Sequence, residues 1–143
     1  MIPLRIIVHC SATQDSGTVS WGAIRKYHKE ILGWKDIGYH FGIEYVGDQL
    51  EILLGRMPNE VGSHVKDHNV GSIGICVIGN FDVDIVAPEH EQVIWRLIWW
   101  LREIHKIPLS EIYGHRDFDS GKSCPGGNLY GFLQSLKKGW VST

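Results

Sequence analysis

The sequence lacks the features of membrane, exported and nucleic-acid-binding proteins. No apolar run in its 143 residues approaches the roughly 18 residues that a membrane-spanning helix needs. The 14 basic and 16 acidic side chains nearly balance, so there is no basic excess of the kind that nucleic-acid-binding domains carry. The opening MIPLRIIVHCSAT has neither the basic region nor the long apolar segment and cleavage site of a signal peptide. We therefore expect a protein made in the cytoplasm without a signal peptide, with neither membrane nor nucleic acid as partner.

Cysteine is scarce, with only Cys10, Cys76 and Cys124. An odd number of cysteines in a chain without a secretion signal argues against a disulfide framework. The chain has no C-x-x-C pair, which closed structural zinc sites commonly contain, and no H-E-x-x-H motif to supply a glutamate base. Cys76 lies in the apolar run SIGICVIGN, so we expect it to be buried as a small apolar residue.

Hydrophobic periodicity predicts a single α/β domain over residues 1–143. Apolar and alternating runs predict strands over 4–9, 72–80 and 111–115, and a hairpin over 39–56 that turns at Gly47-Asp48. Helical spacing predicts helices over 21–32, from Pro88 to before Pro108, and over 129–138, with N-caps at Ser20 and Asn128. This order of strands and helices predicts a central mixed β-sheet flanked by helices.

Two histidines end predicted strands that are far apart in the sequence. His9 ends the first strand and His115 ends the last. Ligands of open α/β sheets bind beyond the strand ends, where the loops converge, so both imidazoles can reach one pocket. His9 follows the apolar residues IIV, where a polar ring needs a metal ion or a hydrogen bond as partner. Cys10, the next residue, faces the other side of the strand, so we do not expect it to be a ligand.

The stretch GHRDFDSGKSCPGGN, which begins at Gly114, supports three interpretations. It can be a structural zinc loop, a reactive cysteine with its base, or one half of a catalytic metal site. Lys122, two residues before Cys124, is expected to lower the pKa of the thiol and favour the thiolate. His9, His115 and Cys124 would together supply the three protein ligands of a catalytic zinc site with an open fourth position. The residues favour a metal over a nucleophilic cysteine, because Cys124 does not clearly begin a helix.

Four motifs occur in the order and spacing of one protein family: IIVHCSAT, WKDIGYHFGI, GSHVKDHNVGSIGI and GHRDFDSGKSCPG. With them the chain resembles the zinc-dependent N-acetylmuramoyl-L-alanine amidases, of the type shared by amidase-type phage lysozymes and peptidoglycan recognition proteins. The resemblance runs from Ile6 to the last predicted helix. It identifies the stretch from Gly114 as one half of a catalytic zinc site.

The resemblance also assigns roles to individual residues. The implied cofactor is Zn²⁺, and its implied ligands are His9, His115 and Cys124. Two residues match catalytic positions of the family, namely Tyr39 in DIGYHF and Lys122 in KSCPG. Three residues fall in motifs that line the substrate cleft, namely Arg56, His64 and Asn69. For His64 a place near the metal is the alternative.

The implied reaction is hydrolysis of the amide that joins the lactyl group of N-acetylmuramic acid to L-alanine in bacterial peptidoglycan. Zinc would polarise the carbonyl, Lys122 would stabilise the oxyanion, and Tyr39 would donate a hydrogen bond or help to move a proton. The resemblance implies a monomeric, bacteriolytic endolysin of a phage or prophage, which acts on the cell wall after release. The alternatives are a non-catalytic module that binds peptidoglycan, an amidase that recycles muropeptides, and an added regulatory role in binding another protein.

Overall fold

The computed structural model describes residues 1–13 and 20–139, which form one mixed five-stranded sheet. The strands are β1 (Arg5–Cys10), β2 (Phe41–Val46), β3 (Gln49–Leu54), β4 (Ser72–Val77) and β5 (Ile112–Gly114). Across the sheet they follow the order β3-β2-β4-β1-β5. β1 is parallel to both β4 and β5, and β2 is parallel to β4, whereas β2 and β3 form the predicted antiparallel hairpin.

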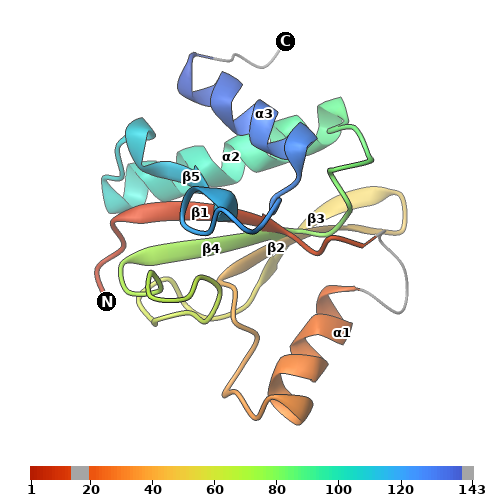
Figure 1. Ribbon diagram of the computed structural model, residues 1–143, viewed down its shortest axis with the longest axis vertical. Helices are drawn as coiled ribbons and strands as arrows, with labels where there is room; N and C mark the ends of the chain where they lie inside the picture. The colour runs from red at the N-terminus through yellow and green to blue at the C-terminus, as the bar shows by residue number, and fades with distance from the viewer. Residues whose placement is uncertain (14–19, 140–143) are drawn as a thin grey trace.

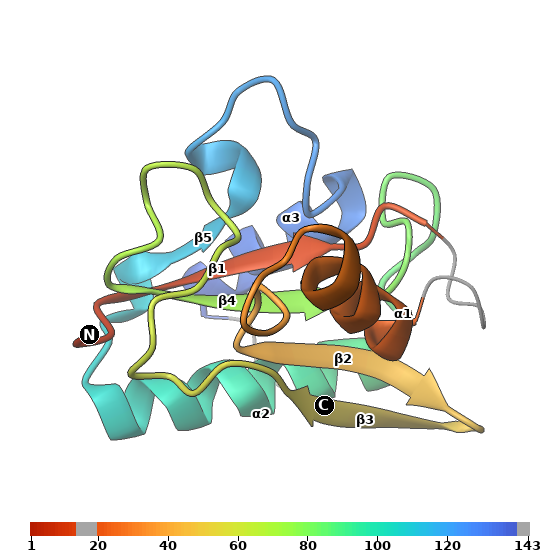
Figure 2. The ribbon, with the colours of Figure 1, turned by 90° about the horizontal axis from the view of Figure 1, so that it is seen from below.

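Helices cover both faces of this sheet, which confirms the predicted α/β architecture. They are α1 (Trp21–Lys26), α2 (Pro88–His105) and α3 (Gly127–Lys137). α2 and α3 lie on one face, and α1 lies on the other (Figures 1 and 2). None of the helices in the described part of the chain is both long enough and apolar enough to cross a membrane.

The core forms on both faces because the inner strands are apolar on both sides. β4 is buried along its whole length, and β1 is buried from Ile6 onwards, as is typical of internal parallel strands. The larger cluster packs beneath α2, whose buried apolar residues recur every three or four positions; they are Ile94, Leu97, Ile98 and Leu101. The smaller cluster lies on the α1 face and consists of Trp21, Ile37, Cys76 and Ile78. Cys76 is therefore buried, as predicted.

The helix ends agree only partly with the local sequence signals. Ser20 caps α1 as predicted, since its hydroxyl accepts a hydrogen bond from the first turn at 3.2 Å. The last turn of the predicted helix, Tyr27–Ile31, is π-helical rather than α-helical. The prediction that Asn128 caps the last helix is wrong, because α3 already begins at Gly127. The N–H of Gly127 donates to Oδ1 of Asp82 at 2.9 Å, and a cap so distant in sequence cannot be seen in the local pattern.

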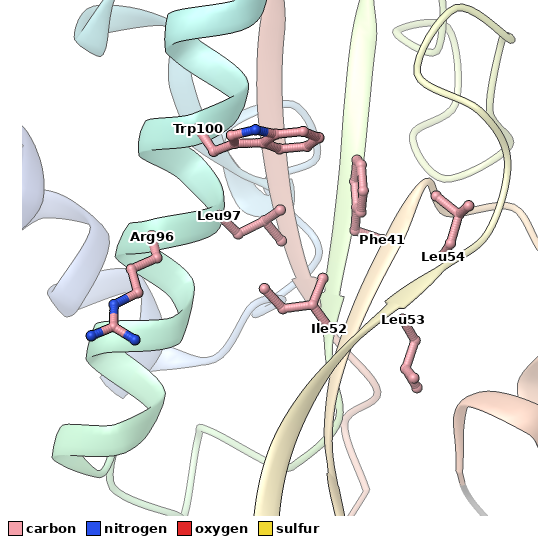
Figure 3. Close-up of a pocket in the computed structure, with 7 residues that line it drawn as sticks. All are labelled: Phe41, Ile52, Leu53, Leu54, Arg96, Leu97 and Trp100. Carbon is pink, nitrogen blue, oxygen red and sulfur yellow. The ribbon is translucent and has the colours of Figure 1, made fainter.

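An apolar groove of about 410 Å³ lies between the β2–β3 hairpin and α2 (Figure 3). Trp100 of α2 meets Phe41 of β2 edge to face, with 6.3 Å between the ring centroids. Trp99, the preceding residue on the helix, and Trp100 are both about half exposed. Adjacent helical positions point in different directions, so only one of these two indoles can pack towards the sheet.

Gly42 in β2 leaves room for the buried ring of Trp21. A Cβ at position 42 would lie 2.3 Å from the nearest ring carbon, so Gly42→Ala should displace the indole. We expect this substitution to lower the free energy of unfolding by about 1–3 kcal/mol. The measurement is equilibrium unfolding in urea.

Gly131→Ala in α3 is the matched control for Gly42→Ala. A Cβ at position 131 would meet nothing within 4 Å, and alanine favours the helix over glycine by up to about 1 kcal/mol. This variant should therefore be as stable as the parent or more stable. Unchanged stability of Gly42→Ala would contradict the packing of Trp21 against β2.

Candidate metal centre

The ends of β1 and β5 place two histidines side by side. Parallel pairing of Val8 with Gly114 brings the residues that follow, His9 and His115, to the same edge of the sheet. Their ring centroids are 4.8 Å apart. His9 is only 1% exposed, and His115 is partly exposed. The two imidazoles therefore share one site, as their positions at strand ends predict.

Cys124 reaches the same point from the loop that follows β5. Its Sγ lies 3.8 Å from Nδ1 of His9 and accepts a hydrogen bond from the main-chain N–H of Cys10 at 3.4 Å. The neighbouring Ser123 holds this loop in place, because its hydroxyl donates to the carboxylate of Asp82 at 2.6 Å. The side chains whose ligand atoms all lie within 4.8 Å of one another are His9, His115 and Cys124.

The three ligand atoms lie close enough together to hold one metal ion. With Zn–N near 2.0 Å and Zn–S near 2.3 Å, a tetrahedral site separates nitrogen and sulfur by about 3.5 Å. The corresponding distance between His9 and Cys124 is 3.8 Å. Two imidazoles and one thiolate are ligands that zinc favours, and three protein ligands leave the open position of a catalytic site. Among the residues described, no other group of histidine, cysteine and acidic side chains gathers in this way.

The surroundings keep both histidines neutral. Burial lowers the pKa of His9 well below its usual value, and His64 and His115 lower it further. Burial also lowers the pKa of His115, where the opposing charge of Asp119 raises it and the charge of Lys122 lowers it by smaller amounts. Neutral imidazole is the form that binds a metal ion, so the two rings are in the state that a metal requires.

The prediction that Lys122 lowers the pKa of Cys124 is wrong. Contact with the thiol of Cys10, together with burial, raises the pKa of the Cys124 thiol. Lys122 itself is exposed, where water and salt screen its charge. Coordination to a metal deprotonates a thiol, so a bound cation would offset this rise in the pKa.

Cys10 belongs to the opposite face of β1. It packs in the larger core cluster together with Ile6 and Val8, two and four residues earlier in the strand. Cys10 is not among the side chains whose ligand atoms converge, although its main chain and its thiol both contact Cys124, and its exclusion as a metal ligand stays a prediction.

Tyr39 lies beside the three ligand residues, between two hollows. Its ring centroid is 5.1 Å from that of His9. It lines a hollow of about 370 Å³ next to α1 and a second hollow of about 470 Å³ whose other walls include Trp34 and Lys66. Burial raises the pKa of Tyr39 well above its usual value. The hydroxyl therefore keeps its proton and can donate a hydrogen bond.

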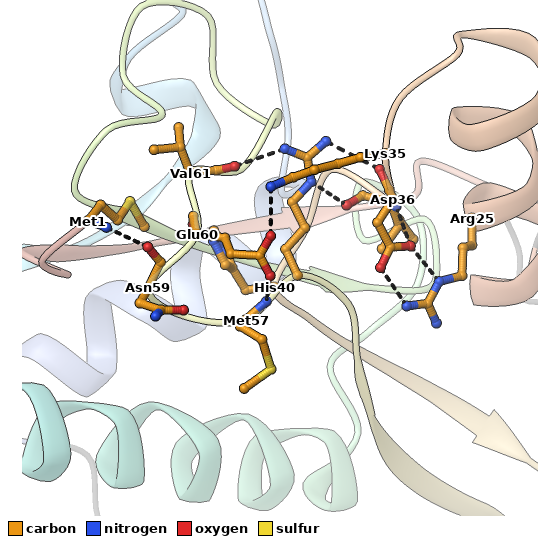
Figure 4. Close-up of polar contacts among 11 residues, drawn as sticks. Met1, Arg25, Lys35, Asp36, His40, Met57, Asn59, Glu60 and Val61 are labelled. Atoms are coloured by element: carbon orange, nitrogen blue, oxygen red, sulfur yellow. Dashed lines mark hydrogen bonds and ion pairs between the residues drawn. The ribbon is translucent and has the colours of Figure 1, made fainter.

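Arg56 is enclosed by main-chain carbonyls. Its guanidinium donates to the carbonyl oxygens of Ile37, Val61 and Asp36 at 3.0, 2.8 and 3.2 Å, and the residue is 7% exposed. The side chain of Asp36 forms an ion pair with Arg25 at 2.7 Å (Figure 4). These bonds tie the segment before β2 to the segment after β3, and contact of Arg56 with substrate stays a prediction.

His64 and Asn69 belong to the loop beside Tyr39. The side-chain oxygen of Asn69 accepts hydrogen bonds from the main-chain N–H groups of His64 and Val65, both at 2.8 Å. The ring of His64 contacts a proposed metal ligand, because its Nδ1 lies 2.9 Å from Nε2 of His9. No local sequence signal marks this contact, since 55 positions separate the two residues. Binding of substrate by His64 and Asn69 stays a prediction.

An open site of two histidines and one cysteine beside a half-buried tyrosine is typical of a metal-dependent hydrolase. A family model described as N-acetylmuramoyl-L-alanine amidase matches residues 2–127 of the sequence. The chain belongs to this family of amidases.

Individual relatives include both phage enzymes and recognition proteins. The endolysin of Enterobacteria phage T3 is 48% identical over 130 residues, which cover 87% of this chain and 81% of the phage protein. The structure of the amidase LysC from Clostridium intestinale is 30% identical with a TM-score of 0.79, covering 95% of this chain and 86% of that one. The structure of PGRP-SA from Apis mellifera is 29% identical with a TM-score of 0.80, covering 100% of this chain and 88% of that one. The fold is therefore common to enzymes and to recognition proteins.

Serine substitutions of the two neighbouring cysteines should have different effects on bound metal. Cys124→Ser replaces a thiolate by a neutral hydroxyl, which is a poor zinc ligand, so this variant should lose most of its metal. Cys10→Ser keeps the main-chain N–H that contacts Cys124 and should retain the metal of the parent. Elemental analysis of the purified proteins measures both, and equal loss from the two substitutions would contradict the orientation of β1.

Proposed function

We propose that the protein is a zinc-dependent N-acetylmuramoyl-L-alanine amidase that lyses bacterial cell walls as an endolysin. The observation that carries this proposal is the cluster of three ligand atoms, which lie within 4.8 Å of one another, beside Tyr39 and Lys122. Membership of the amidase family supports the same activity. The bond that is hydrolysed is the amide between the lactyl group of N-acetylmuramic acid and L-alanine of peptidoglycan.

His9, His115 and Cys124 would hold the zinc ion, because they are the three residues whose ligand atoms converge. A zinc ion bound there supplies a Lewis acid that polarises the amide carbonyl and activates water. The two neutral imidazoles keep the site free of competing positive charge. Cys124 contributes the single negative charge among the three ligands.

Lys122 and Tyr39 would act on the amide itself. Attack on the amide carbon places negative charge on the former carbonyl oxygen, and the ammonium of Lys122 stabilises that charge. One preorganised donor of this kind is typically worth about 3 kcal/mol in the transition state. Tyr39 keeps its proton, since burial raises its pKa, so its hydroxyl donates a hydrogen bond to the reacting group.

The two hollows beside Tyr39 would receive the parts of the substrate on either side of the amide. One hollow lies next to α1, and the other contains the aromatic ring of Trp34 and the charge of Lys66. Both of these groups lie in the second hollow, which therefore suits the peptide side of the amide, because the charge of Lys66 can pair with a peptide carboxylate. All groups of the site come from one chain, and we propose that the protein acts as a monomer.

A non-catalytic peptidoglycan-binding module is the alternative from a different functional class. It would need the hollows but neither the metal ligands nor the two catalytic side chains. The convergence of His9, His115 and Cys124 therefore favours the enzyme. An amidase that recycles soluble muropeptides would use the same chemistry and would differ from an endolysin in its preferred substrate.

Lys122→Ala and Tyr39→Phe should lower turnover by about 10²–10³-fold each, because each removes a group that acts mainly in the transition state. Both variants should keep the zinc content of the parent, since neither side chain is a ligand. Tyr39→Phe keeps the ring that lies 6.3 Å from Trp21, so the packing should survive. The measurement is the release of L-alanine amino groups from purified cell wall.

Lys138→Ala is the control for loss of a positive charge, because Lys138 is exposed at the end of α3, away from the site. It should cleave the wall like the parent. Near-normal rates for Lys122→Ala and Tyr39→Phe would refute the catalytic roles assigned to them.

Parallel assays on intact wall and on soluble muropeptides should separate the three functions. An endolysin releases amino groups from intact wall, whereas a recycling enzyme acts mainly on the soluble fragments. A protein that contains zinc and sediments with the wall, yet releases no amino groups from either substrate, is a recognition module. That last result would refute the proposed activity.

A further inference from the structure

Both ring nitrogens of His9 have partners, and they lie on opposite sides of the ring. Nδ1 faces the sulfur of Cys124 at 3.8 Å. Nε2 lies 2.9 Å from Nδ1 of His64, and the two rings meet edge to face with centroids 4.9 Å apart. Only Nδ1 can therefore coordinate the metal, because Nε2 is hydrogen-bonded to His64.

The main chain of β4 sets the direction of these hydrogen bonds. Nε2 of His64 lies 3.2 Å from the carbonyl oxygen of Ser72, and a carbonyl can only accept a hydrogen bond. His64 therefore carries its proton on Nε2, and in a neutral imidazole the other nitrogen is then an acceptor. It follows that Nε2–H of His9 donates to Nδ1 of His64. The free lone pair of His9 is left on Nδ1, which faces Cys124 and His115.

The ring of His64 is held in a closely fitted slot. A Cβ at Gly74 would lie 2.7 Å from the ring, and a Cβ at Gly62 would lie 2.8 Å from it. The ring of His40 meets it edge to face at 5.8 Å. His40 is itself fixed at both nitrogens, since it accepts from Gly74 N–H at 3.0 Å and donates to the carbonyl of Glu60 at 2.7 Å (Figure 4).

We propose that His64 is a positioning residue for the metal ligand His9, acting through a hydrogen-bonded chain that runs from Ser72 through His64 to His9. The chain selects the tautomer of His9 that presents Nδ1 to the metal, and it fixes the plane of the ring. The inference rests on the proposed zinc site and adds a residue to it. It also assigns His64 to the ligand rather than to the substrate, because both of its nitrogens have partners within the protein.

Two amide substitutions of His64 distinguish this role from a general structural one. In His64→Asn the amide oxygen lies near the former position of Nδ1 and can still accept from His9. In His64→Gln the amide is one carbon farther out, near the former Nε2, and leaves Nε2–H of His9 without its acceptor. Loss of such a partner typically weakens metal binding by about 10–100-fold.

The first measurement is zinc affinity, by competition with a chromophoric chelator. We expect His64→Gln to bind zinc about 10–100-fold more weakly than the parent, and His64→Asn to recover most of that loss. Parent-like zinc affinity in His64→Gln would overturn the proposal, as would equal weakening in the two variants. With zinc at saturation, the KM of His64→Gln for a soluble muropeptide should be unchanged, whereas a substrate-binding role would raise KM and leave zinc affinity intact.

The second measurement needs no substitution and therefore does not depend on a variant folding. Nitrogen-15 NMR of the zinc-free protein should show His9 protonated on Nε2, with a scalar coupling across the hydrogen bond to Nδ1 of His64. Protonation of His9 on Nδ1, or the absence of that coupling, would overturn the proposal. A parent protein that binds no zinc would instead refute the proposed function, so the two failures are distinguishable.

Discussion

Main-chain hydrogen bonds between β1 and β5 fix the relative positions of the two histidines of the metal centre. The register pairs Val8 with Gly114, so that His9 and His115 leave the sheet at the same edge. A shift of one residue would turn His9 to the opposite face, because side chains alternate along a strand. β5 has only three residues, and α3 supports it from outside, where the ammonium of Lys137 donates to the carbonyl of Ile112 at 3.1 Å.

Glycines at the strand ends allow the third ligand and its neighbours to approach this pair. A Cβ at Gly114 would lie 2.7 Å from the ring of Pro125, the residue after Cys124, so a larger residue would push the cysteine loop away from β5. A Cβ at Gly74 on β4 would likewise lie 2.7 Å from the ring of His64. The glycines of β5 and β4, the strands on either side of β1, thus let side chains pack directly against the main chain.

Burial gives the site its chemical character. It is the largest cause that lowers the pKa of His9 and raises the pKa of Tyr39, so that both rings are held neutral. Burial also opposes ionisation of Cys124. Coordination of a cation would offset this opposition, and in a setting of low dielectric each hydrogen bond to a ligand contributes more than it would in water.

The sequence by itself determined the strands and the order of the main elements, and it predicted the three residues of the proposed metal centre that the structure brings together. Periodicity and strand-end positions indicated His9 and His115, and alternation along β1 excluded Cys10, because these signals are local. The tertiary structure decided the contacts between segments that are far apart in the sequence. The cap of α3 by Asp82, the raised pKa of Cys124 and the contact of His64 with His9 all join residues that no local pattern connects, since side chains meet there only after the sheet and its loops have packed.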